Sequence, residues 1–247
     1  MVIEVTTTPV SPLRHLHDTR VSVQKLRVQI GNRLSSLERG VDHVDRPVPN
    51  VYDQVAGMAA EMEKALDHSI QQELQAWPVY DAWLGHVKGI GPGFSGQLLA
   101  MLLPPIAGKG PSSWYKAAGL YTEQRDGLSR LPRARAGEGK ITYHPWLRQC
   151  LWNIGESFVK QGGGGYYRNV YDQAKARLSA LHMGDASWPP HRLHSVAKWK
   201  TVKLFLAHLW EAWAELEGIP QRPPYPIDVL GHTGYIPRPM PQDGKRI

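Results

Sequence analysis

Apolar residues recur at spacings of three and four in two stretches near the start of the chain, which is the pattern of amphipathic helices. The first stretch contains Val23, Leu26, Ile30, Leu34 and Leu37. The second contains Val51, Val55, Met58, Met62, Leu66, Ile70, Leu74 and Trp77. Neither helix can bury its apolar stripe alone. We therefore expect residues 18–77 to form an antiparallel helical hairpin or a coiled coil, and residues 20–77 to support a homodimer.

The remaining sequence is also mostly helical in pattern, so the expected fold class is all-α, with a second helical domain over residues 78–217. Helical spacing of apolar residues recurs over 147–158, 166–181 and 192–217. The run 140–143 is the best strand candidate. Residues 1–17 lack periodicity and predict a flexible arm. Seven prolines in residues 218–247 predict an extended tail.

The composition is that of a globular protein with a modest basic excess. The chain has 247 residues, 42% hydrophobic and 21% charged, with a formal net charge of +7. This charge permits an anionic partner. Cys150 is the single cysteine, which excludes an intrachain disulfide and a cysteine-based zinc cluster. The chain has no secretory signal pattern and no long apolar run, so we expect a cytoplasmic protein with no membrane contact, no metal and no cofactor.

A glycine turn provides the first candidate binding site. The sequence there reads Val87-Lys88-Gly89-Ile90-Gly91-Pro92-Gly93, followed by apolar residues at helical spacing. Gly89 and Gly91 permit a tight turn, Ile90 can plug it, and Pro92 suits the first turn of a helix. This pattern is typical of a helix-hairpin-helix, in which free N–H groups bind a DNA phosphate and Lys88 adds a charge. The alternative is a turn that joins two packed helices and binds nothing.

A basic segment provides the second candidate site. Six basic residues lie between Gln124 and Gln149, against Asp126 and Glu138, for a net charge of +4: Arg125, Arg130, Arg133, Arg135, Lys140 and Arg148. Lys198 and Lys200 form a further basic concentration in the last helical stretch. We expect these residues to contact a DNA backbone with little sequence selectivity. The alternative is a solvated surface loop.

The order of these elements resembles the C-terminal half of the insertion-sequence-110 transposases, which are relatives of the Piv DNA invertase. The resemblance spans roughly residues 20–215 and includes the glycine turn, the stretch 114–120, the basic segment and the helix that Leu147-Arg148 opens. In that family a RuvC-like domain with four acidic metal ligands precedes the coiled coil. A serine nucleophile follows the segment that matches Ala118-Gly119-Leu120, within a Ser-Gly pair. Ser129 lies in the corresponding loop here, but Arg130 follows it.

The leading hypothesis is a DNA-binding protein of prokaryotic, viral or mobile-element origin that acts without the nuclease half, and we expect no strand cleavage by this chain alone. One alternative is a serine-bearing recombinase subunit that works with a separate RuvC-like chain, and a neighbouring gene for such a chain would favour it. A guide RNA is a further partner that the resemblance admits. The other alternative is a non-enzymatic structural protein, which absence of DNA binding at low salt would favour.

Overall fold

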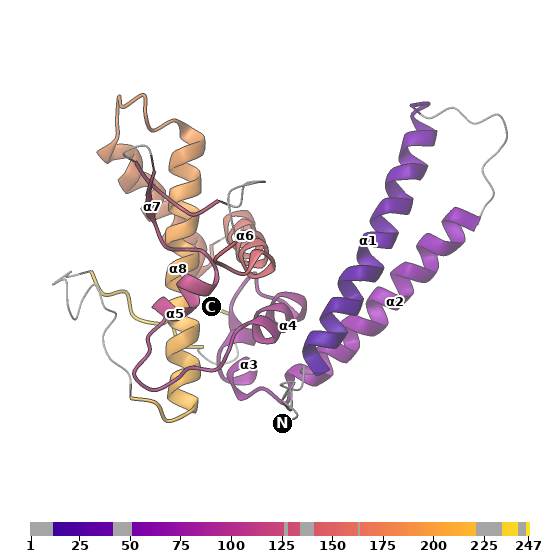
Figure 1. Cartoon of the computed structure of the whole chain (residues 1–247), viewed down its shortest axis with the longest axis horizontal. Helices are drawn as coiled ribbons and strands as arrows, with labels where there is room; N and C mark the ends of the chain where they lie inside the picture. The colour runs from indigo at the N-terminus through magenta and orange to yellow at the C-terminus, as the bar shows by residue number, and fades with distance from the viewer. Residues whose placement is uncertain are drawn as a thin grey trace, which may run out of the picture. The chain divides into compact units, whose positions relative to one another are not determined.

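The chain is mostly helical, which confirms the all-α fold class (Figure 1). A computed structural model describes residues 12–41, 51–125, 128–133, 141–162, 164–220, 234–241 and 246–247. Backbone contacts divide the chain into two compact units, Met1–Ala76 and Trp77–Ile247, and each is treated by itself below. Across these described ranges, no helix has both the length and the apolar character that crossing a bilayer requires.

The first unit is an antiparallel pair of helices, α1 (Pro12–Glu38) and α2 (Val51–Leu74) (Figure 1). Part of each predicted stripe faces the other helix, so Ile30 and Ile70 are buried inside the pair, whereas the stripe residues Leu26, Met58 and Met62 are exposed. Ion pairs flank the seam: Arg20 Nε lies 2.7 Å from Asp67 Oδ1, and Arg27 Nε lies 2.5 Å from Glu63 Oε1. The earlier residue of α1 pairs with the later residue of α2, which is the register of an antiparallel pair.

Helix α1 begins earlier than the sequence pattern predicted. Pro12 occupies the start of the helix, where its missing N–H leaves no hydrogen bond unmade. Leu13 is fully buried, and burial lowers the pKa of His17. The prediction of a flexible arm over residues 1–17 is therefore wrong for residues 12–17. Residues 1–11 lie outside the described part of the chain.

The second unit packs short and long helices around one central helix. Its elements are α3 (Pro78–Ala82), the 3-10 helix η1 (Leu84–His86), α4 (Pro92–Met101), α5 (Ser112–Ala117), β1 (Glu123–Arg125), β2 (Leu128–Arg130), α6 (Pro145–Lys160), α7 (Tyr166–Leu181) and α8 (Pro190–Leu216). Helix α8 contacts α3, α6 and α7, and α4 packs on α6. Figure 1 shows α8 running through the length of this unit.

Aromatic side chains fill the core beside α8. The Phe205 ring lies 6.0 Å from Trp83, 5.3 Å from Phe158 and 5.4 Å from Tyr167, measured between centroids. These four side chains are almost completely buried, and burying a large side chain of this kind contributes about 2–3 kcal/mol to the free energy of unfolding. The cluster therefore joins the α3–η1 junction, α6, α7 and α8 into one core.

The strands lie in a different place from the one predicted. Residues 141–143 form no strand, and residue 140 is not described. Instead β1 pairs antiparallel with β2, with Glu123 opposite Arg130. The two residues between the strands are Asp126-Gly127, a dipeptide that favours two-residue hairpin loops, and sequence reasoning overlooked this signal. Tyr143 packs its ring against Gly119 instead, where a Cβ atom would lie only 2.6 Å from the ring.

Residues 234–241 of the proline-rich tail lie along the second unit through hydrogen bonds to their carbonyl groups. The Trp83 indole donates to Pro239 O at 2.9 Å, and the Tyr166 hydroxyl donates to Pro237 O at 2.9 Å. His208 Nε2 lies 3.0 Å from Ile236 O, while its Nδ1 lies 2.9 Å from the Tyr167 hydroxyl. A neutral imidazole satisfies both contacts, with Nε2 as the donor.

Burial lowers the pKa of His208 to about 4, which makes the unit sensitive to acid. The unfolded chain binds this proton below about pH 6.5, but the folded chain binds it only near pH 4. We therefore expect the free energy of unfolding to fall by up to about 3 kcal/mol from this group as the pH drops through that window. Denaturant titrations at several pH values should show a smaller decrease for His208→Gln.

His191→Gln provides the control for this experiment, because His191 is exposed on the same helix. The control should keep the wild-type dependence of stability on pH. Equal pH dependence in the wild type and His208→Gln would show that His208 does not titrate with folding.

Candidate nucleic-acid interface

The glycine turn is built on one glycine rather than two. Gly89 has φ +90°, and a Cβ atom there would lie 2.7 Å from Gln161 Nε2. The Ser157 hydroxyl donates to Gly89 O at 2.8 Å, which fixes the turn on the end of α6. Ile90 is only 2% exposed and plugs the turn as expected. Gly91 has φ −98° and open space around it, so the expectation that the turn needs glycine there is wrong.

The N-terminus of α4 presents unused backbone donors. Gly91 is the N-cap and supplies no side-chain acceptor, and the first intrahelical bond runs from Ser95 N to Gly91 O at 3.0 Å. The N–H groups of Gly93 and Phe94 precede that bond and have no acceptor within the helix. Residues 91–93 remain partly exposed. The positive end of the α4 dipole therefore faces an accessible surface that suits an anion.

Two features of the turn depart from the expected motif. The element before it is the single 3-10 turn η1 rather than an α-helix. The Lys88 ammonium donates to Gly164 O at 2.6 Å, and the Lys88 backbone N–H donates to Ile247 O at 2.8 Å. Lys88 is thus tied to neighbouring backbone instead of extending freely beside α4. The helix-hairpin-helix assignment stays a prediction.

The structure separates the basic candidates into distinct groups. Arg130 is exposed at the end of β2, Arg133 is exposed shortly after it, and Lys200 is exposed on α8, so all three can reach a phosphate. Arg148 lies half-buried near the start of α6 and donates to Pro132 O at 2.5 Å. The remaining candidates fall outside the described structure, as whole residues or as a side chain: Arg135, Lys140 and the Arg125 side chain.

Lys198 is wrong as a DNA contact, because it is 1% exposed. Its ammonium group pairs with Glu156 and lies 2.8 Å from the centre of the Trp152 ring. Burial lowers the pKa of Lys198, while the hydrogen bond to Glu156 opposes that shift. A buried ammonium needs such a partner, so Lys198 joins α8 to α6 and does not reach the surface.

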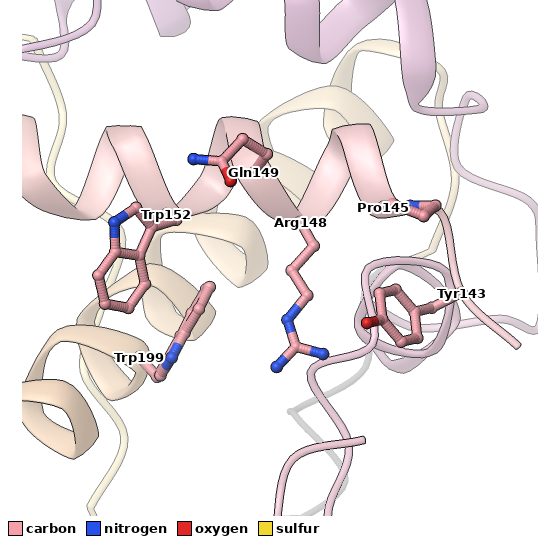
Figure 2. A pocket seen from close by; sticks show the side chains of 6 residues that line it. All are labelled: Tyr143, Pro145, Arg148, Gln149, Trp152 and Trp199. Carbon is pink, nitrogen blue, oxygen red and sulfur yellow. The ribbon is translucent and has the colours of Figure 1, made fainter. Parts of the chain in front are cut away.

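A pocket of about 310 Å³ opens beside this ion pair, and Figure 2 shows its lining. The lining residues are Tyr143, Pro145, Arg148, Gln149, Trp152 and Trp199. The Arg148 guanidinium lies 4.9 Å from the Tyr143 ring centre and 5.9 Å from that of Trp199. The rings of Trp152 and Trp199 are 5.6 Å apart and tilted by 56°. These tryptophans were not singled out in the sequence, although Arg148 and Trp152 have the spacing of one helix face.

Helix α6 keeps the pocket apart from the glycine turn. Arg148 faces the pocket, whereas Ser157 holds Gly89. Nine residues separate these two positions, which is about 2.5 turns of an α-helix. The pocket and the turn therefore lie on opposite faces of α6.

The surroundings of the candidate nucleophile Ser129 do not activate it. Ser129 is exposed on β2 opposite Gln124, and within the described part of the chain no hydrogen bond joins its hydroxyl to a base. Ser95, in the chain's one Ser-Gly pair, is fully buried. Burial raises the pKa of the Cys150 thiol. No group of three or more potential metal ligands gathers among the residues described.

No protein-family model and no curated protein sequence matches this chain. The resemblance to the insertion-sequence-110 transposases therefore stays a prediction.

The two glycines of the turn should respond differently to substitution. Gly89→Ala should lower the free energy of unfolding by about 1–3 kcal/mol, because it strains a left-handed residue and crowds Gln161. Gly91→Ser should leave stability unchanged or raise it slightly, because serine is a good N-cap residue and has space there. Urea titrations check both variants. A Gly91→Ser variant less stable than Gly89→Ala would contradict this account of the turn.

Proposed function

We propose that this protein binds DNA through the sugar–phosphate backbone, with the N-terminus of α4 as the primary phosphate site. The observation that carries the proposal is the open start of α4, where the N–H groups of Gly93 and Phe94 lack helical acceptors and the N-cap Gly91 has no side chain to cap them. Such a helix end combines free donors with the positive pole of the dipole, which is the arrangement that binds phosphate.

The distribution of charge supports an anionic polymer as the partner. Arg130, Arg133 and Lys200 are exposed cations on the same unit as the turn, and the whole chain carries a net charge of +7. Contacts of this kind read no base edges, so binding should depend on salt much more than on sequence. The predicted resemblance of the element order to the transposase C-terminal half would agree with this role.

We also propose that the first unit forms a homodimer. Intramolecular pairing of α1 and α2 leaves Met58 67% and Met62 52% exposed, one turn apart on α2, and Leu26 is 47% exposed on α1. An apolar surface of this kind favours a second copy as its cover. Two copies would then place two phosphate sites on one DNA, which raises avidity without new contacts.

DNA binding should weaken steeply with salt and should depend on the start of α4. If the protein neutralises about four to six phosphates, the log–log salt slope is about −4 to −5. Gly93→Asp should weaken duplex binding at least about tenfold, since its carboxylate repels phosphate and competes for the same N–H groups. Fluorescence anisotropy with a labelled duplex measures both quantities.

Gly93→Ala is the matched control, because the space at Gly93 is open and the substitution adds no charge. The Gly93→Asp and Gly93→Ala variants should both fold, and an aspartate in the first turn should even stabilise the helix. Unchanged duplex affinity in a folded Gly93→Asp variant, or a flat salt response in the wild type, would contradict the proposal.

The dimer should depend on the exposed methionines. Met58→Asp combined with Met62→Asp should give a folded monomer with weaker DNA binding, because the charges oppose apolar association without entering the α1–α2 seam. Gln71→Asp combined with Gln72→Asp adds the same charge at exposed positions of α2 and should remain dimeric. Light scattering over a concentration series distinguishes these outcomes, and a monomeric wild type would refute the dimer.

A further inference from the structure

We propose that the Arg148 pocket binds one unpaired nucleotide of a nucleic-acid strand. In this arrangement the base stacks on the tryptophan faces and Arg148 contacts the phosphate. The inference rests on the proposed nucleic-acid binding but uses a different face of α6, so the two can fail separately.

The aromatic walls of the pocket supply the stacking surface. Tyr143, Trp152 and Trp199 are half-buried, whereas Trp83, Trp114 and Trp213 are at least 95% buried in the core. Half-buried rings that line a hollow leave their faces available to a flat ligand. Base–aromatic stacking tolerates any base, because every base has a π-face. A pocket of about 310 Å³ is at the small end of ligand pockets, which suits one ring system.

The polar groups of the pocket select an anionic ligand. Arg148 is its one charged lining residue among those described, and no carboxylate lines it. One guanidinium N–H donates to Pro132 O, and no other acceptor for Arg148 occurs in the described structure. The free edge of a planar guanidinium matches a phosphate with two parallel hydrogen bonds. Gln149 adds an exposed amide that can donate to or accept from a base edge.

The surrounding contacts hold the pocket in place before a ligand arrives. Lys198 supports the Trp152 ring from inside the protein, and Glu156 neutralises Lys198. His194 Nε2 lies 3.9 Å from the same Glu156 carboxylate, and its Nδ1 lies 2.7 Å from the Tyr171 hydroxyl. Arg148 is fixed by Pro132 and by the Tyr143 ring. A preformed site of this kind loses less conformational entropy on binding.

The pocket favours an unpaired strand over a duplex, because the base must expose its face to enter. A base within a duplex is covered by its neighbours on both faces, so it reaches the tryptophan faces that line the pocket only after leaving the stack. The exposed cation Arg133 follows Pro132, the hydrogen-bond acceptor of Arg148, and the exposed cation Lys200 follows Trp199, which lines the pocket. They can guide the adjacent phosphates of a flexible single strand.

The test uses the full chain and a single-stranded oligothymidylate that carries one 2-aminopurine, a fluorescent base analogue. The wild type should bind this probe and quench its fluorescence through stacking. Trp199→Leu and Trp152→Leu should each weaken binding about 5- to 150-fold and abolish the quenching. Trp199→Phe should retain most of the affinity, because it keeps an aromatic face. Arg148→Lys should weaken binding less than tenfold while quenching persists, because the charge remains.

Trp146→Leu is the matched control, since Trp146 is exposed on the same helix but does not line the pocket. It should bind the probe as the wild type does. Thermal melting of each variant confirms that it folds, and the Trp199→Phe variant keeps the test informative where a leucine variant does not fold. Pocket variants that melt like the wild type and bind the single strand equally well would overturn the inference, as would an equal loss in Trp146→Leu.

Duplex DNA and Gly93→Asp separate this inference from the proposed function. Duplex affinity should be unchanged in the pocket variants, and the quenching of the single-strand probe should persist in Gly93→Asp, because the stacked base contacts no residue of α4. Single-strand binding without duplex binding would uphold the pocket and refute the α4 site. Duplex binding without quenching would do the reverse. An oligouridylate compared with an oligodeoxyuridylate, which differ only in the 2′-hydroxyl, shows whether the strand is RNA or DNA: equal affinity supports a shared base-and-phosphate chemistry, and a preference for either names the source.

Discussion

The all-round burial of the middle of α8 is the constraint on which the second unit depends. From Phe205 to Ala214 every residue except Glu211 is buried, so this segment has no solvent face and must be covered on all sides. Helices α3, α6 and α7 supply part of the cover, and residues 234–241 add to it through His208. Polar groups in such a segment must find partners within the protein, and His208 finds them in Tyr167 and the Ile236 carbonyl.

The same constraint shapes the pocket, because α6 must approach α8 closely. Gly155 makes this approach possible: a Cβ atom there would lie 2.8 Å from Lys198 Cγ and 3.0 Å from Val202 Cγ2. At this crossing the long Lys198 side chain is buried against α6, and its charge is compensated by Glu156. The next residue on α8, Trp199, then reaches the side where Trp152 and Arg148 leave α6 (Figure 2). The pocket is thus a consequence of how two core helices cross.

Sequence periodicity predicted the helices well where the apolar stripe is also the core. Every residue of the predicted stripe in α6 is buried: Leu147, Cys150, Leu151, Ile154 and Phe158. Prediction failed where the deciding contact lies far along the chain. Lysine is a residue type that usually lies on the surface, and only the pairing of Lys198 with Glu156, 42 residues away, explains its burial. The pocket likewise depends on a contact between residues far apart in the sequence, Trp152 and Trp199. Two local signals were overlooked in the sequence. Asp126-Gly127 indicates the β1–β2 hairpin, and Pro12 indicates the start of α1.

The two proposed sites lie on opposite faces of α6, and this limits the kind of nucleic acid that can occupy both at once. The α4 terminus offers backbone N–H groups and suits a phosphate of any strand, duplex included. The pocket offers ring faces and suits a base that has left its stack. Because one helix about 10 Å across separates the two faces, a straight duplex on one face leaves the other unoccupied. A duplex that continues into an unpaired strand can pass around α6 and engage both, so a branched or frayed DNA satisfies the geometry better than either form alone.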